Sequence, residues 1–265
     1  MDATGRVFVI AEAGTTPGGK LETMRRMIGA GAKAGADAVK FQWCSNPEKL
    51  CQRRNAPEYL ETYRLLAFDP AWHLALWREC EEQGVKYMAT GYLPEDIRTL
   101  ALFVHAFKVA SFEACDRAFI RRHYLYDRPV FISTGMCDES ELAWLLSQRK
   151  RHPQVKLLHC VTAYPAPTNE LNLAAIRQCG LDGYSDHSGR PSTGALAVAA
   201  GARIIEVHFR SQDADPIHPD FPHSLDEGQL GEYIASIRDV EEMLGDGVKR
   251  VMPSEEPLLR FRVRA

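Results

Sequence analysis

A short apolar run, a turn and an amphipathic helix follow one another eight times along the 265 residues of this chain. Apolar runs that alternate with helices are typical of a parallel sheet whose faces are covered by helices. Eight such units are the number that closes a parallel sheet into a barrel, and the chain length suits one barrel domain. We therefore predict the α/β class and a single-domain (β/α)8 TIM barrel. The expected strands are Val7–Ala11, Ala38–Gln42, Lys86–Ala89, Ala106–Ala110, Val130–Ser133, Lys156–Cys160, Gly183–Asp186 and Ile204–His208.

The expected helices lie between these strands and after the last one. One connection, Cys44–Asp69, is much longer than the others, and long loops that follow a strand often fold over an active site. The helices are expected near Leu21–Lys33, Pro70–Gln83, Pro94–Phe103, Asp116–His123, Glu139–Lys150, Leu171–Gln178, Thr193–Ala200 and Leu225–Leu244.

The composition of the chain indicates which kinds of binding partner to expect. Basic and acidic residues are mixed and the net charge is −3, so no nucleic-acid-binding surface is indicated. The seven cysteines have no Cys-x-x-Cys spacing, which favours a reduced, cytoplasmic setting over a disulfide framework. The first apolar run is far too short for an export signal or a membrane span. We expect a cytoplasmic protein that binds neither nucleic acid nor membrane.

In a parallel barrel the functional residues lie at the carboxyl ends of the strands. Every expected strand of this chain ends in polar or ionisable residues. They are Glu12, Lys40, Gln42, Thr90, Lys108, Ser111, Glu113, Ser133, Thr134, His159, Ser185, Asp186, His187, Glu206 and His208.

Two of these residues, Lys40 and Lys108, lie in runs that are otherwise apolar. Burying an ammonium group is costly unless an anion lies beside it. That anion belongs either to a ligand, with nearby hydroxyls as further donors, or to an internal ion pair with Glu12 or Glu113. Both readings stay open for each lysine alone. Together with the histidine pair, the lysines favour an anionic ligand.

His187 and His208 each close a strand of one strand–helix–strand unit. The ends of the two strands would face one another across the same barrel mouth. Two neutral imidazoles can hold a transition metal and leave positions open for water and substrate. The other histidines stay open or are read as structural: His159, His218 and His223 have no settled role, and His73, His105, His123 and His152 are expected at the surface or at helix ends.

Eight motifs occur in order over nearly the whole chain: VFVIAEAG (7–14), AGADAVKFQ (34–42), FKVASFE (107–113), PVFISTGM (129–136), LLHCVTAYPAP (157–167), GYSDHSG (183–189), IIEVHF (204–209) and PDFPHSLDEGQL (219–230). Each is a moderate signal alone, and the ordered set is specific. In these motifs the chain resembles the sialic acid synthase family, which comprises N-acetylneuraminate synthases and their legionaminate, pseudaminate and spore-coat relatives.

The resemblance implies a (β/α)8 transferase of carbohydrate biosynthesis that condenses phosphoenolpyruvate with a sugar aldehyde, giving a 2-keto sugar acid and phosphate. It implies Mn²⁺ or another divalent metal on His187 and His208, and catalytic roles for Glu12, Glu113 and His187. The substrate-binding residues that it implies are Lys40, Gln42, Thr90, Lys108, Ser111, Ser133, Thr162, Tyr164, Ser185 and Asp220, the last of these on the sugar.

The implied chemistry agrees with the residue types. Phosphoenolpyruvate carries a phosphate and a carboxylate, for which two lysines and several hydroxyls are suitable donors. A divalent metal can act as a Lewis acid on the aldehyde oxygen. A carboxylate can then help water to add at C2 before phosphate leaves.

The chain also departs from the family pattern. Thr16–Gly19 replaces the family's Asn-His-x-Gly, and the segment Arg210–Asp220 is rewritten, so the identity of the aldehyde stays open. Val207 replaces a lysine, and strand alternation points it away from His208, towards barrel packing. The family continues, after a segment like Pro253–Glu255, into an antifreeze-like domain. We expect a barrel over residues 1–250 and a tail over 251–265 without that domain, and a homodimer fits the family's habit.

Three functions remain at this point. A phosphoenolpyruvate-dependent synthase is favoured. A metal-dependent aldolase or lyase that does not use phosphoenolpyruvate is disfavoured, because both Lys40 and Lys108 are present. A non-catalytic scaffold partner of a full-length synthase is disfavoured by the intact histidine pair.

Overall fold

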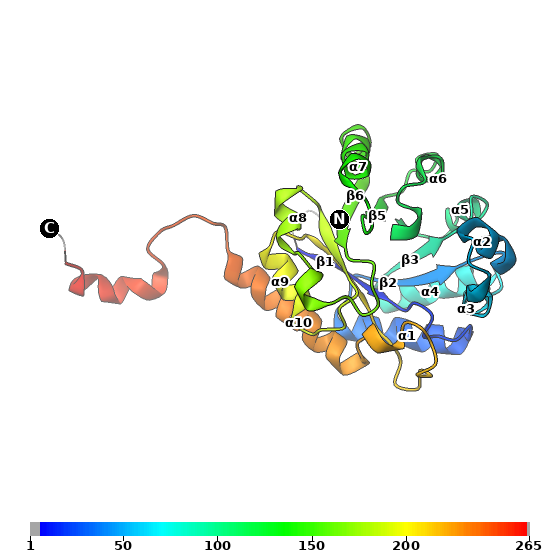
Figure 1. Cartoon of the computed structure of the whole chain (residues 1–265). Coiled ribbons are helices and arrows are strands. Elements are labelled where there is room, and N and C mark those ends of the chain that lie inside the picture. The colour runs from blue at the N-terminus through cyan, green and yellow to red at the C-terminus, as the bar shows by residue number, and fades with distance from the viewer. Residues whose placement is uncertain (1–5, 264–265) are drawn as a thin grey trace.

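The protein, in a computed structural model that describes residues 6–263, forms a closed parallel barrel whose strands follow one another in chain order (Figure 1). Each strand pairs with the next, and β1 pairs with β8 to close the ring. The predicted (β/α)8 barrel is therefore confirmed. Its strands are β1 (Phe8–Glu12), β2 (Ala38–Trp43), β3 (Lys86–Gly91), β4 (Ala106–Val109), β5 (Val130–Ser133), β6 (Val155–Cys160), β7 (Gly183–Asp186) and β8 (Ile204–His208).

The helices that cover the barrel lie where they were predicted, within a few residues at most ends. Two are much shorter than expected, α5 (Asp96–Leu100) and α8 (Ala174–Gln178). In α5 the cause is local: the Asp96 carboxylate accepts hydrogen bonds from the backbone of Tyr92 and Leu93, so these residues form a turn and the helix begins late. The other barrel helices are α1 (Leu21–Ala34), α4 (Trp72–Gln83), α6 (Arg117–His123), α7 (Glu139–Arg151), α9 (Thr193–Ala199) and α10 (Glu227–Leu244).

The long connection between β2 and α4 is not an irregular loop. It contains α2 (Pro47–Arg54), a 3₁₀ turn (Pro57–Tyr59) and α3 (Leu60–Arg64). Asn46 starts α2 by accepting a hydrogen bond from the Lys49 amide, with proline at the first helical position. Residues of α2 and α3 line the cavity described below, so the expectation that this segment lies over the active site is met.

Alternation along the strands gives the barrel two cores. Outward residues such as Val39, Phe107 and Val207 pack against the helices, which agrees with the packing role expected for Val207. Inward residues near the amino ends of the strands form a second, enclosed apolar cluster: Phe8, Ile10, Ala38, Met88, Ala106, Phe131, Leu158 and Ile204. The next inward positions towards the carboxyl ends are polar, so the same alternation that fills the lower barrel also aims polar side chains into its upper half.

Two histidines depart from expectation. His73 on α4 and His123 on α6 were expected at the surface, but both are buried between the helices and the strands. His73 shares a 2.7 Å hydrogen bond with the Tyr87 hydroxyl, and His123 donates to the Phe119 carbonyl at 3.1 Å. Aromatic neighbours surround both rings, so each acts as a core residue with one hydrogen bond, and Nε2 of His73 is buried without a partner.

After α10 the chain leaves the barrel (Figure 1, orange to red). A 3₁₀ helix, Pro253–Phe261, follows, and every described residue from 242 to 263 is exposed. The boundary expected at residue 250 stays a prediction. Among residues 6–263, no helix combines the length and apolar character needed to cross a bilayer.

Candidate active site

A cavity of about 850 Å³ opens at the carboxyl ends of the strands. Of the residues given a catalytic, substrate-binding or metal-binding role from the sequence, all but Glu12 and Thr162 line it. The predicted residues that line it are Lys40, Gln42, Thr90, Lys108, Ser111, Glu113, Ser133, Tyr164, Ser185, His187, His208 and Asp220.

Lys40 lies on the cavity floor and is almost completely buried. Its ammonium contacts the Glu12 carboxylate at 2.5 Å and donates to the Thr90 hydroxyl at 2.9 Å. Glu12 also accepts from Gln42 (2.9 Å) and from the Gly14 amide (3.0 Å). The ion pair foreseen for Lys40 is therefore present, and Glu12 lies behind the lysine and the glutamine, where burial raises the pKa of its carboxyl group.

Lys108 is the second floor cation. Its counter-ion is Glu206 on β8, 3.7 Å away, rather than the Glu113 considered from the sequence. Glu206 also lies 3.9 Å from Lys40 and accepts from Ser185 at 3.3 Å. Burial alone would oppose ionisation of Glu206, but the two lysines hold its pKa down to about 2. Burial lowers the pKa of Lys108, and Glu206 opposes that shift.

Both floor lysines retain a donor for a ligand. An ammonium has three N–H groups. Lys40 uses two of them, on Glu12 and Thr90, and Lys108 uses two, on the Val109 carbonyl (3.1 Å) and the Ser133 hydroxyl (2.7 Å). One N–H of each lysine is thus left for an anion in the cavity.

The histidines of the site converge on one side of the mouth. Ligand atoms of His208, Asp220 and His223 all lie within 4.8 Å of one another. The His223 ring is 1% exposed and neither of its nitrogens has a hydrogen-bond partner, and the Nδ1 atom of His208 is likewise buried and unpartnered. Burial, together with neighbouring imidazoles, lowers the pKa of His208 to about 4 and of His223 to about 3, so both rings are neutral. Neutral imidazoles with a carboxylate suit a divalent transition metal.

His187 completes this side of the cavity. Its Nδ1 atom donates to the Val161 carbonyl at 2.9 Å, which leaves Nε2 as the nitrogen with a free lone pair. The His187 and His208 ring centroids are 5.4 Å apart, and the Cys160 sulfur lies 3.5 Å from His187 Nδ1. Cys160 was read as incidental from the sequence. Its sulfur lies inside the barrel, next to Ser111 and His187. The available sequence signal was strand alternation, which places the side chain of residue 160 on the inward face of β6.

Asp220 is held in place by the turn that follows β1. One of its oxygens accepts from the Thr15 amide at 2.7 Å. A side chain at Gly14, where φ is +54°, would place a Cβ 2.3 Å from that oxygen and 3.1 Å from His208 Nδ1. The position therefore requires glycine both for its backbone conformation and for the close approach of the two ligand groups.

The wall opposite the histidines is built by α2. Both Nε and Nη2 of Arg54 donate to one Glu113 oxygen, at 3.0 and 2.7 Å. The guanidinium also lies over the rings of Tyr92 and Phe112, 4.7 and 4.8 Å from their centroids. Burial raises the pKa of Glu113 although Arg54 opposes that shift.

Some functional positions were missed in sequence. Glu206 stood among the polar strand ends but was given no role, and its inward parity was the available signal. Arg53, Arg54, Tyr59 and Tyr63 reach the cavity from the segment between β2 and α4, for which only a long connection was predicted although Asn46 and Pro47 signal a helix start. Conversely, His159 faces outward and bonds the Leu171 carbonyl at 2.8 Å, outside the cavity. Thr162 lies beside Gly135, next to Ser111, without lining the cavity.

Similarity to known proteins covers nearly the whole chain. The NeuB family model matches residues 27–249. The N,N'-diacetyllegionaminic acid synthase of Legionella pneumophila is 32% identical, over 95% of this chain and 77% of the relative, and the pseudaminic acid synthase of Campylobacter jejuni is 31% identical, over 98% and 80%. A crystal structure of N-acetylneuraminic acid (sialic acid) synthetase from Leptospira borgpetersenii in complex with citrate superposes with a TM-score of 0.87 at 28% identity, covering 97% of this chain and 91% of that one.

Proposed function

This chain belongs to the NeuB family, and from that membership we propose that it is an enzyme that condenses phosphoenolpyruvate with a sugar aldehyde to a 2-keto sugar acid and releases phosphate. Its similarity to the synthases of legionaminic and pseudaminic acid supports a product of the sialic acid type. The observation that carries the proposal is the pair of buried lysines on the cavity floor, each with one N–H unused.

Phosphoenolpyruvate would bind over that floor. Lys40 and Lys108 would each donate their remaining N–H to its phosphate or carboxylate, and Ser111, Ser133 and Ser185 would supply hydroxyl donors. Glu12 and Glu206 would keep both lysines charged and in place, so their role is to position the donors. Gln42, held between Glu12 and the Tyr92 hydroxyl, extends the polar floor towards α2.

A divalent metal, Mn²⁺ or a similar ion, fits the other side. His187 and His208 would hold it, with His223 and Asp220 as further donors, because the ligand atoms of His208, Asp220 and His223 lie together and are buried and partly unpartnered. Although burial opposes the shift, the neighbouring Cys160 sulfur raises the pKa of His187 to about 9, so His187 would lose a proton when the ion binds. The bound ion would supply a Lewis acid for the aldehyde oxygen. Tyr164, whose ring centroid lies 4.5 Å from that of His187, would close the same side of the cavity over the sugar.

Glu113 is the carboxyl group best placed to move a proton. It lies in the cavity wall with a raised pKa, and Arg54 fixes its orientation. A carboxyl group of this kind can take a proton from water as it adds at C2 of the condensed intermediate. Breakdown of that adduct then expels phosphate from C2, which balances the reaction.

The test is phosphate release from phosphoenolpyruvate with Mn²⁺ and a panel of aldoses that includes N-acetylhexosamines and diacetamido-hexoses. The matched control is His208→Ala, with its fold checked by circular dichroism. Metal-dependent phosphate release with one sugar, lost in the control, supports the synthase. A 2-keto acid cleaved or formed from pyruvate without phosphoenolpyruvate supports the aldolase instead. Absence of binding by both Mn²⁺ and phosphoenolpyruvate would refute the proposal.

A further inference from the structure

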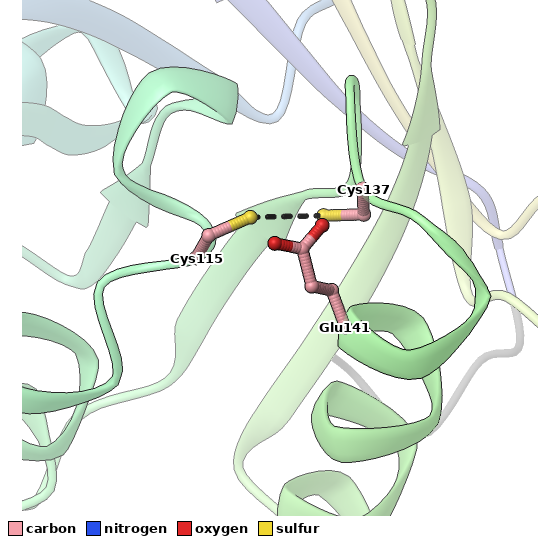
Figure 2. A group of neighbouring side chains, drawn as sticks. All are labelled: Cys115, Cys137 and Glu141. Atoms are coloured by element: carbon pink, nitrogen blue, oxygen red, sulfur yellow. Dashed lines mark hydrogen bonds between the residues drawn. The ribbon is translucent and has the colours of Figure 1, made fainter.

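Two cysteines and one glutamate lie close together outside the cavity. Cys115 follows the 3₁₀ turn Ser111–Glu113 after β4, Cys137 lies in the loop after β5, and Glu141 lies in the first turn of α7. Their ligand atoms all lie within 4.8 Å of one another. Figure 2 shows the two sulfurs facing each other with the Glu141 carboxylate beside the gap between them.

The spacing of the sulfurs matches a tetrahedral metal site. The two Sγ atoms are 4.0 Å apart. With zinc–sulfur bonds of about 2.3 Å, two thiolates on a tetrahedral ion lie about 3.8 Å apart. A disulfide needs them at about 2.05 Å. The loops therefore already hold the sulfurs at the separation that an ion would impose, whereas a disulfide would require them to approach by nearly half.

The carboxylate is held in place and has no cationic partner. One Glu141 oxygen accepts from the Asp138 amide at 2.8 Å, as part of the capping box that begins α7. Among the described residues, no lysine, arginine or histidine forms an ion pair with Glu141. The remaining oxygen is thus free to face the sulfurs.

From this geometry we propose that Cys115, Cys137 and Glu141 form a binding site for a zinc-like divalent cation, with water as the fourth ligand. Both thiols would lose their protons to solvent on binding, and the ion would join the loop after β4 to the loop after β5.

A cation bound at Cys115 would also affect the cavity wall. Cys115 stands between Glu113 and Asp116, which both line the cavity, and Asp116 forms an ion pair with Arg53 at 2.7 Å. An ion at Cys115 would therefore fix this stretch of wall from its outer side. The proposed site is separate from the histidine site and does not depend on the proposed reaction.

Cobalt(II) is the probe, titrated into the full chain under a phosphine reductant. Thiolate-to-cobalt charge-transfer absorption reports sulfur ligation directly. We expect saturable absorption in the wild type and in the cysteine control Cys179→Ser, half-buried at the end of α8. We expect its complete loss in Cys115→Ser/Cys137→Ser, together with loss of the zinc-dependent rise in melting temperature.

Glu141→Gln tests the third ligand. Glutamine still accepts from the Asp138 amide, so the capping box and α7 persist while the anionic ligand is lost. We expect cobalt affinity to fall at least about tenfold, the range found when a supporting group of a metal site is removed. The proposal is overturned if the wild type shows no thiolate absorption, if the absorption survives in the double serine variant, or if Glu141→Gln binds cobalt as tightly as the wild type.

Discussion

Glu206 shows how one inward position sets the charge of a cavity. It lies 3.7 Å from Lys108 and 3.9 Å from Lys40 and is the only carboxylate among the described residues that forms ion pairs with both. Removing one partner of a buried ion pair leaves an uncompensated charge. We expect Glu206→Gln to lower the free energy of unfolding by about 3 kcal/mol, measured by urea unfolding.

The same variant makes a second prediction, about ligand binding. Without the Glu206 carboxylate, burial favours the uncharged form of Lys108, so inorganic phosphate should bind at least about tenfold more weakly than in the wild type. Thermal midpoints measured against phosphate concentration give this comparison, with the exposed Glu232→Gln as control. Equal phosphate affinity in Glu206→Gln and wild type would mean that the lysines do not form the anion site.

The buried position of His223 was not indicated by the sequence. It lies in a proline-rich loop, yet its ring is buried and neither nitrogen has a hydrogen-bond partner, although Nε2 lies 3.5 Å from the Asp220 carboxylate. We expect His223→Ala to weaken Mn²⁺ binding at least about tenfold, measured as free Mn²⁺ by electron paramagnetic resonance. His218→Ala, in the same loop but outside the His208–Asp220–His223 cluster, should bind as the wild type does. Unchanged affinity in His223→Ala would restrict the metal site to His187 and His208.

Strand parity explains which of these residues could be found from sequence. Lys40, Lys108 and His208 stood out because a polar residue in an apolar strand must face inward or find a partner. Glu206 has the same parity as His208 and was accessible to the same reasoning. His223 was not, because only the folded path of the loop after β8 brings it beside His208.

At the level of elements, the segment between β2 and α4 supplies one wall of the cavity through a single buried pair. Arg54 is about 15% exposed and Glu113 about 3% at their side chains. We expect Arg54→Met to destabilise the fold by about 3–5 kcal/mol, because Glu113 would stay buried without its cation. Arg54→Met/Glu113→Leu should recover most of that loss. Urea unfolding of the four members of the cycle measures the coupling, and strictly additive losses would show that the pair is not coupled.

The outer helices carry a second electrostatic feature. Burial lowers the pKa of His73 on α4 and of His123 on α6 to about 4. The unfolded chain protonates each imidazole near pH 6.5, whereas the folded chain does so only near pH 4. Stability is therefore complete above about pH 6.5 and falls as the pH drops towards 4, by about 2 kcal/mol per histidine between pH 7 and pH 5.

Replacing one of these two histidines isolates its contribution to the pH dependence of stability. Between pH 7 and pH 5, the free energy of unfolding of His123→Phe should fall by about 2 kcal/mol less than that of the wild type. Urea unfolding at both pH values measures this difference. His152→Phe is the matched control, since His152 stacks on Tyr124 and remains partly exposed. An identical pH dependence in His123→Phe and wild type would contradict a neutral His123 in the folded state.

The elements that sequence predicted best were those with periodic apolar residues, namely all eight strands and most helices. The helices α2 and α3 escaped because they are short and their inward residues contact a cavity wall rather than the barrel, so little periodicity marks them. Arg53 and Arg54 look like an ordinary basic helix end. Their role depends on Asp116 and Glu113, which lie in the connection after β4, about sixty residues away in sequence.

At the scale of the whole molecule, stability and chemistry occupy opposite ends of the barrel. The enclosed apolar cluster around Phe131 fills the amino ends of the strands, while the charged floor and the histidines fill the carboxyl ends. The segment after α10 contributes to neither, because every described residue from 242 to 263 is exposed. Leu258 and Phe261 are 61% and 67% exposed, so they bury little apolar surface within this chain.

A chain that ends after Arg250 therefore tests where the folded unit stops. Because apolar burial is what stabilises a domain, and residues 251–263 bury little apolar surface, we expect residues 1–250 to melt at nearly the same temperature as the full chain and to bind Mn²⁺ and phosphate with unchanged affinity. Sedimentation velocity of both forms is the companion measurement. A lower melting temperature, or a smaller assembly after truncation, would show that the apolar side chains of Pro253–Phe261 dock on a second copy, and the boundary at residue 250 would then be wrong for the assembled protein.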